Sequence, residues 1–139
     1  MQRIVIDTNV MVSALIQRSY PYRIIYDLFI DEKIILCVSN EPMAKYYEIL
    51  SREKFAKFPH FFIRAEALLV DIKSKSVKYF PTIELDLISE PDDNMVVELA
   101  DECFANFVIT GNTTDFTFLI YKQTKIVTPR EYWENNQPD

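Results

Sequence analysis

The sequence predicts one α/β domain, residues 1–139, with helices layered on a mostly parallel sheet. Short apolar runs rich in β-branched residues alternate along the chain with segments of helical periodicity. That alternation is typical of strand–helix–strand units, whose consecutive strands run parallel. Hydrophobic residues make up 49% of the chain, and no internal repeat, low-complexity tract or linker divides it. We therefore expect one domain that is long enough to bury a sizeable core.

The first half of the chain should contain two strands and four helices. A β-branched run favours a strand buried on both faces, and apolar residues three and four apart favour a helix. Ser39 begins a helix-capping pattern, and Pro21 suits the first turn of a helix. We expect strands at residues 4–6 and 33–38, a first helix from residue 10 to about 18–19, and further helices at 21–29, 40–50 and 59–76.

The second half should continue the same alternation. A short strand is expected at 77–80, where Pro81 ends it, and a helix opens at 89–94 and runs to Cys103. A buried strand at 106–110 is broken by Gly111. The remaining elements are a short helix around 115–121, a last strand at 125–128 and a closing helix from Pro129.

Composition excludes several kinds of site. His60 is the only histidine and Gly111 the only glycine, which argues against histidine-rich zinc sites and glycine-rich phosphate loops. Cys37 and Cys103 lie in apolar contexts and are interpreted as core residues rather than as a disulfide or a metal pair. The carboxylates remain as the candidates for chemistry.

Charge and hydropathy narrow the class of protein. The net charge of −6 and the pI near 4.8 argue against a protein that coats nucleic acid, but they permit a nuclease with a local basic patch. No apolar run approaches the roughly 20 residues that span a bilayer. Only Arg3 precedes an apolar run that Asp7 cuts short, so no secretory signal is expected and the predicted location is cytoplasmic.

Acidic and amide side chains stand where predicted strands end or a helix begins. Asp7 follows the first strand, and Asn112 follows the strand at 106–110, with Asp115 just beyond it. Because ligands of open parallel sheets bind outside the carboxyl ends of the strands, these side chains should face a crevice. The alternative for Asp7 is a role in capping the next helix. Asp92 is interpreted as a helix N-cap, whereas Asp93, one position further in, could point into the crevice.

Such a set of oxygen ligands predicts a divalent metal ion. Carboxylates gathered in one crevice repel each other unless a cation lies between them. Oxygen ligands without histidine or thiolate match Mg²⁺ or Mn²⁺. These ions activate water and stabilise charge on a phosphodiester oxygen, so the pattern suggests metal-dependent phosphodiester hydrolysis.

Four blocks of the chain, taken together and in order, resemble the PIN domain, and most closely its branch of toxin components of toxin–antitoxin pairs. The blocks are IVIDTN at 4–9, SEPDDN at 89–94, VITGN at 108–112 and VTPREY at 127–132. The resemblance implies a three-layer α/β/α sandwich with a five-stranded parallel sheet and a Mg²⁺ or Mn²⁺ site. It also implies endoribonuclease activity on single-stranded or structured RNA, frequent homodimers and a small antitoxin protein as partner.

The resemblance assigns the acids residue by residue. Asp7 matches the first family acid, and Asp93 matches the third because Ala100 follows it at the family's spacing. The two would form the metal site. Lys45 stands where the second acid is expected, and Asn112 where the fourth is expected.

Nearby acids could replace the two that are altered. Glu48 and Glu41 lie about one turn from Lys45 on nearly the same helix face, and Glu48 is preferred because capping explains Glu41. Asp115 could compensate for Asn112. The expected catalytic set is Asp7, Asp93, Glu48, Asn112 and Asp115.

Substrate contacts are expected from polar and basic residues around this set. Lys45, Arg52, Lys54 and Lys57 cluster with Phe55 and Phe58, a pattern that could hold RNA phosphates and stack bases. The alternative is a solvated face with the two aromatic rings turned into the core. The candidate substrate-binding residues are Thr8, Asn9, Lys45, Arg52, Lys54 and Thr110.

Two other functions compete with a nuclease. The first is a catalytically silent binding module, in which Lys45 fills the vacated metal position by pairing with Asp7 or Asp93. The second is a phospho-acceptor receiver domain, which needs adjacent acids after an early strand. The lone Asp7 after the first strand, and Ser39 after the second, disfavour the receiver.

Overall fold

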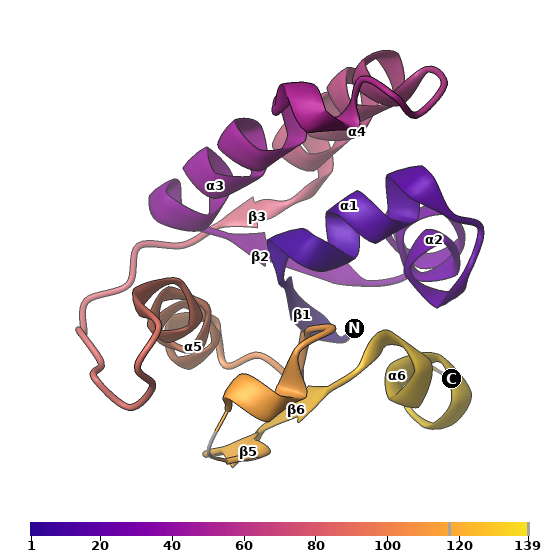
Figure 1. Cartoon of the computed structure of the whole chain (residues 1–139). Coiled ribbons are helices and arrows are strands. Elements are labelled where there is room, and N and C mark those ends of the chain that lie inside the picture. Colours follow the sequence, from indigo (N-terminus) through magenta and orange to yellow (C-terminus); the bar gives the residue numbers. More distant parts are fainter. Residues whose placement is uncertain (117, 139) are drawn as a thin grey trace.

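In the computed structural model, the chain forms a sheet with helices on both faces (Figure 1). The structure describes residues 1–116 and 118–138. The sheet order is β3-β2-β1-β4-β6-β5. Its strands are β1 (Arg3–Ile6), β2 (Ile35–Val38), β3 (Val77–Lys78), β4 (Phe107–Ile109), β5 (Ile120–Tyr121) and β6 (Thr124–Val127). The five strands from β3 to β6 run parallel, as expected, and β5 adds an antiparallel sixth strand at the edge.

The strand β1 is central and is buried on both faces. Ile4 pairs with Leu36 of β2 on one side and with Phe107 of β4 on the other. Because side chains of a strand alternate between faces, Ile4 and Ile6 pack into one core while Val5 packs into the other. The β-branched run therefore stabilises both layers at once.

The larger helical layer covers the face of Ile4 and Ile6. Its core contains the large buried side chains Phe29, Tyr46 and Phe61. The elements of this layer are α1 (Thr8–Ile16), α2 (Tyr20–Arg23), the π-helical η1 (Ile24–Phe29), α3 (Asn40–Leu50), η2 (Glu53–Phe55), α4 (Phe61–Lys75) and α6 (Pro129–Asn135). The closing helix α6 begins as predicted, with a capping box between Thr128 and Glu131.

The opposite face is covered by α5 (Pro91–Cys103). Val97, Leu99 and Ala100 of this helix pack over Val5 of β1 and Val108 of β4 in the second core. Cys37 and Cys103 are both buried there with free thiols, which confirms their interpretation as core residues.

An extended segment, residues 79–90, joins β3 to α5 and is called the strap here (Figure 1). It has no regular secondary structure, and side chains of α5 hold its backbone. Asn94 accepts hydrogen bonds from the backbone N–H groups of Leu87 and Ile88 (both 3.1 Å) and donates one to the carbonyl of Ile88 (2.6 Å). One turn further on, the carboxylate of Glu98 accepts from the N–H of Leu85 (2.7 Å). The strap is thereby tied to the helix that it precedes.

The predicted helix around 115–121 is wrong. A single 3-10 turn, η3 (Thr113–Asp115), is followed by β5, which pairs with β6. Lys122 adopts a positive φ of 51° at the turn between the two strands. Pairing with β6 thus overrides the helical spacing of the local sequence. The residues that determine this pairing belong to β6 and lie outside the segment itself.

None of the helices in the described part of the chain is long and apolar enough to cross a membrane.

Candidate active site

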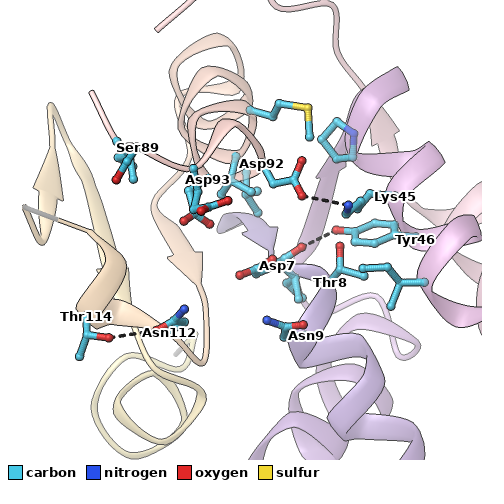
Figure 2. Close-up of a pocket in the computed structure, with 18 residues that line it drawn as sticks. Asp7, Thr8, Asn9, Lys45, Tyr46, Ser89, Asp92, Asp93, Asn112 and Thr114 are labelled. Atoms are coloured by element: carbon cyan, nitrogen blue, oxygen red, sulfur yellow. Dashed lines mark hydrogen bonds and ion pairs between the residues drawn. The ribbon is translucent and has the colours of Figure 1, made fainter. Parts of the chain in front are cut away.

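A pocket of about 510 Å³ opens where β1 and β4 end and α5 begins (Figure 2). Residues from the ends of both strands, from α3 and from the strap line it. Among them are the side chains of Asp7, Thr8, Asn9, Lys45, Tyr46, Glu90, Asp92, Asp93, Asn112 and Thr114. The prediction that Asp7 and Asp93 share one crevice agrees with this arrangement, in which β1 and β4 are neighbours in the sheet.

Asp7 lies at the N-cap position of α1, but its side chain makes no capping hydrogen bond to that helix. Its Oδ2 atom instead accepts a hydrogen bond from the Oγ1 atom of Thr110 at 2.8 Å. The backbone N–H of Asp7 donates to the carbonyl of Ile109 (2.9 Å), which fixes the residue against the end of β4. The capping alternative for the Asp7 carboxylate is therefore not supported by the geometry.

Thr110 connects Asp7 to Asn112. The Thr110 side chain is fully buried, and besides donating to Asp7 its Oγ1 atom accepts from the backbone N–H of Asn112 at 3.2 Å. The Oδ1 atom of Asn112 accepts from the hydroxyl of Thr114 at 3.0 Å (Figure 2). The loop after β4 thus joins the backbone of Asn112 to Thr110 and its amide oxygen to Thr114.

Asp93 reaches the same pocket from α5, where it occupies the first turn. Figure 2 shows its carboxylate on the wall of the pocket that faces Asp7. A carboxylate in the first turn is favoured by the helix dipole, so the fold supports a negative charge at this point.

Asp92 is not the N-cap of α5, and that interpretation is wrong. The N-cap residue is Glu90, and Asp92 lies inside the first turn. The Asp92 carboxylate points across the pocket to α3, where its Oδ2 atom lies 2.9 Å from the Nζ atom of Lys45 (Figure 2). This hydrogen-bonded ion pair raises the pKa of Lys45. Lys45 therefore pairs with Asp92 in the pocket, a partner that the sequence did not suggest.

Glu48, the preferred replacement for the second acid, does not line the pocket, and that preference is not supported. Its side chain is 58% exposed, and its carboxylate lies 3.0 Å from the guanidinium of Arg52, just beyond the end of α3. Glu41 lines a separate pocket between α3 and the strap. Asp115 belongs to η3, and its side chain lies outside the described part of the structure.

Of the basic and aromatic cluster, only Lys45 lines the pocket, and the members that follow α3 do not. The amine of Lys54 lies over the ring of Phe55 at 5.3 Å from its centroid, and neither residue lines the pocket. Phe55 is buried against Phe61, and Phe58 packs partly against the same core. This is the arrangement of the alternative interpretation, in which both rings turn inward.

Tyr46 is a supporting residue that sequence reasoning missed. Its ring is fully buried in the larger core, and its hydroxyl donates a hydrogen bond to the carbonyl of Ile6, directly before Asp7 (Figure 2). Burial, with a smaller contribution from the Asp7 carboxylate, raises the pKa of the Tyr46 phenol. The predicted helix at 40–50 contains Tyr46, but helical spacing carries no signal for the bond from its hydroxyl to the carbonyl of Ile6.

The donors of the pocket fit a hard divalent ion bound by few protein ligands. Asp7, Asp93 and Asn112 offer carboxylate and amide oxygens, the ligand type that Mg²⁺ and Mn²⁺ prefer. Within residues 1–116 and 118–138, no three His, Cys, Asp or Glu side chains are grouped closely enough to form a complete cage. Mg²⁺ usually keeps several waters and binds through one or two carboxylates plus substrate phosphates, so two acids suffice.

Comparison with known families gives one result. A family model described as "PIN domain" matches residues 3–114, which extend from β1 to η3 and include every described residue of the pocket. A search of curated proteins found no match.

Proposed function

Because the chain belongs to the PIN domain family, a family of nucleases, we propose that it is a metal-dependent endoribonuclease that acts in the cytoplasm. The observation that carries the proposal is that Asp7 and Asp93, far apart in the sequence, line one pocket. Both stand at positions that match family acids. As its biological role we propose the toxin component of a toxin–antitoxin pair.

In this proposal, Asp7 and Asp93 hold a Mg²⁺ or Mn²⁺ ion, and Asn112 supplies a neutral oxygen beside them. When bound, such an ion neutralises charge on the scissile phosphate and makes an attacking water more acidic. Thr110 fixes one oxygen of Asp7 by hydrogen bonding, which limits the directions in which that carboxylate can bind. A carboxylate oxygen of Asp7 or of Asp93 that is not bound to the ion would accept the proton that the water loses.

Substrate contacts would come first from the residues that line the pocket. Thr8, Asn9 and Lys45 do so and can reach a phosphodiester group there. Arg52 and Lys54 lie outside the pocket, so a contact with RNA would require the strand to continue along the end of α3.

A catalytically silent binding module is the second candidate. Lysine at position 45 and asparagine at position 112 favour it, because each replaces a negative charge with a positive or neutral group. The two candidates differ in metal binding, since a silent module has no need to bind Mn²⁺.

The test combines metal binding with RNA cleavage. Calorimetric titration of the purified protein with Mn²⁺ should show binding below millimolar metal, and single-stranded RNA should be cleaved only when Mg²⁺ or Mn²⁺ is present. Asp7→Asn and Asp93→Asn should lose both properties, while Asp31→Asn, in an exposed ion pair with Lys33, serves as the matched control. If Asp7→Asn left Mn²⁺ affinity and cleavage unchanged, the nuclease proposal would be abandoned. Absence of Mn²⁺ binding at millimolar metal would favour the silent module.

We further propose a second copy of the chain and a small antitoxin protein as partners. Exposed apolar side chains on α3 and α4, among them Tyr47, Phe62 and Val70, support contact with other proteins. The toxin role predicts that expression of the chain in bacteria arrests growth and that Asp7→Asn relieves the arrest. Sedimentation of the purified protein tests the dimer.

A further inference from the structure

The pocket is strongly acidic for a site that would receive a polyanion. Four carboxylates line it, those of Asp7, Glu90, Asp92 and Asp93. Among the described residues of its lining, Lys45 is the only basic one. One divalent ion at Asp7 and Asp93 would offset two of these four charges, and Lys45, 2.9 Å from Asp92, would offset a third.

Lys45 lies on the side of the pocket near Asp92. Its Nζ atom is 2.9 Å from Asp92 on α5, and the next carboxylate, that of Glu48, is 3.8 Å away, beyond hydrogen-bonding distance. A lysine ammonium has three N–H donors, so the bond to Asp92 leaves others for a second acceptor. The Lys45 side chain is 27% exposed and the Asp92 side chain is 56% exposed. Solvent, and therefore a ligand, can reach the pair.

Asp92 determines where the ammonium lies. Lysine has a flexible four-carbon stem, and on α3 alone its Nζ atom could occupy a wide range of positions. The ion pair draws it toward Asp92 in the first turn of α5 (Figure 2). The pair thus holds a positive charge between the two helices that flank the pocket.

We propose that Lys45, held by Asp92, binds a non-bridging phosphate oxygen of the RNA next to the metal position, and that Asp92 is a positioning residue for this contact. The inference rests on the proposed nuclease function. It adds to that function the residue that binds the negatively charged phosphate of the substrate. Lys45 then supplies a cation at a place where the family pattern has an acid.

The first test measures RNA affinity against salt. Binding of a short fluorescein-labelled single-stranded RNA is followed by anisotropy in Ca²⁺, an ion that also takes oxygen ligands, for the wild type, Lys45→Met, Lys45→Arg and Lys33→Met. Lys45→Met should weaken binding roughly fivefold at 0.1 M salt and lower the slope of log affinity against log salt by about 0.7, the contribution of one single-strand phosphate contact. Lys45→Arg should keep the slope. Lys33→Met, at the opposite end of the sheet, is the control for loss of one lysine and should also keep it.

The second test asks whether RNA binding becomes weaker or tighter when the Asp92 carboxylate is removed. Removal of a carboxylate from the pocket should tighten RNA binding if only net charge matters, and Glu90→Ala should do so. Asp92→Ala should instead weaken binding, because Lys45 loses the group that holds it. If Asp92→Ala tightened binding as Glu90→Ala does, Asp92 would not be a positioning residue. If Lys45→Met left the salt slope unchanged while the protein kept its melting temperature, the phosphate contact would be refuted.

These outcomes are separable from the failure of the nuclease proposal. A wild-type protein that binds RNA with the Lys45-dependent slope but cleaves none would keep the phosphate contact and lose the nuclease assignment. A protein that cleaves RNA with the same KM and kcat in the wild type and in Lys45→Met would keep the assignment and lose the contact. In an active protein we expect Lys45→Met to raise KM more than it lowers kcat.

Discussion

At the scale of single residues, Thr110 is the group on which the orientation of Asp7 depends. Its hydroxyl is buried, donates to the Asp7 carboxylate and accepts from the backbone of Asn112. Thr110→Val keeps the shape but removes both bonds. Loss of such a supporting hydrogen bond typically costs 10-fold to 100-fold in metal affinity or activity, so we expect a decrease of about that size in Mn²⁺ affinity by calorimetry. Thr110→Ser should keep most of the affinity, and an unchanged affinity in Thr110→Val would show that Asp7 is oriented by other contacts.

Tyr46 gives a prediction for stability at alkaline pH. Its pKa in the folded chain is raised above the ordinary value of 10.0, chiefly by burial, so the unfolded chain releases the phenolic proton at lower pH. The folded state then binds more protons above that pH, and the free energy of unfolding should fall as pH rises past 10.0.

Tyr46→Phe checks that contribution. At neutral pH it should cost about 1 kcal/mol, because the bond to the Ile6 carbonyl is lost. Above the ordinary phenol pKa its stability should decline less steeply than that of the wild type, although buried Tyr132, whose pKa is also raised, keeps part of the decline. Urea unfolding across this pH range measures both effects, and parallel curves for the two proteins would contradict the assignment to Tyr46.

Individual site residues differ in how far the sequence could predict them. Asp7 and Asp93 were predictable because a strand end and a helix start fix where the backbone places them. The pairing of Lys45 with Asp92 was not, because it depends on how α3 and α5 approach each other across the pocket. The position of Glu48 was not predictable either, since its helix face alone does not show that its carboxylate pairs with Arg52 outside the pocket.

At the scale of elements, the strap depends on the buried side chain of Asn94, which satisfies three backbone groups of Leu87 and Ile88. Asn94→Ala leaves those groups without their partner and should lower the free energy of unfolding by about 1–3 kcal/mol. Hydrogen exchange should rise at Leu87 and Ile88 before it rises in β1. Asn106→Ala, which removes a single exposed bond to the backbone of Arg3, is the control. Uniform exchange changes throughout the chain would contradict a local role for Asn94.

The elements themselves were largely predictable, with one exception. The strands at the centre of the sheet are continuous β-branched or apolar runs, which local sequence identifies directly. The segment at 115–121 also carries an apolar run, residues 118–121, but the run is short enough to fit a helix or a strand, and β5 forms there in antiparallel pairing with β6. The spacing of apolar residues within one segment does not predict its pairing with another strand.

At the scale of the whole molecule, metal binding should be linked to folding. A ligand that binds only the folded state stabilises it, by about 2.7 kcal/mol at 100 times its Kd. Mn²⁺ should therefore raise the melting temperature of the wild type. Asp7→Asn should lose this gain while its metal-free form is as stable as the wild type or more so, because repulsion between carboxylates is relieved. Asp31→Asn should keep the gain, and an equal gain in Asp7→Asn would place the ion elsewhere.

The sheet order divides the pocket between two parts of the chain that the strap joins. Asp7 and Lys45 precede the strap, whereas Asp93 and Asn112 follow it, and β1 and β4 meet along the seam. A protease cut within residues 79–90 would separate the polypeptide into two fragments, each with half of the pocket. Neither fragment alone could cleave RNA, so recovery of cleavage on mixing would act as a direct reporter of complementation.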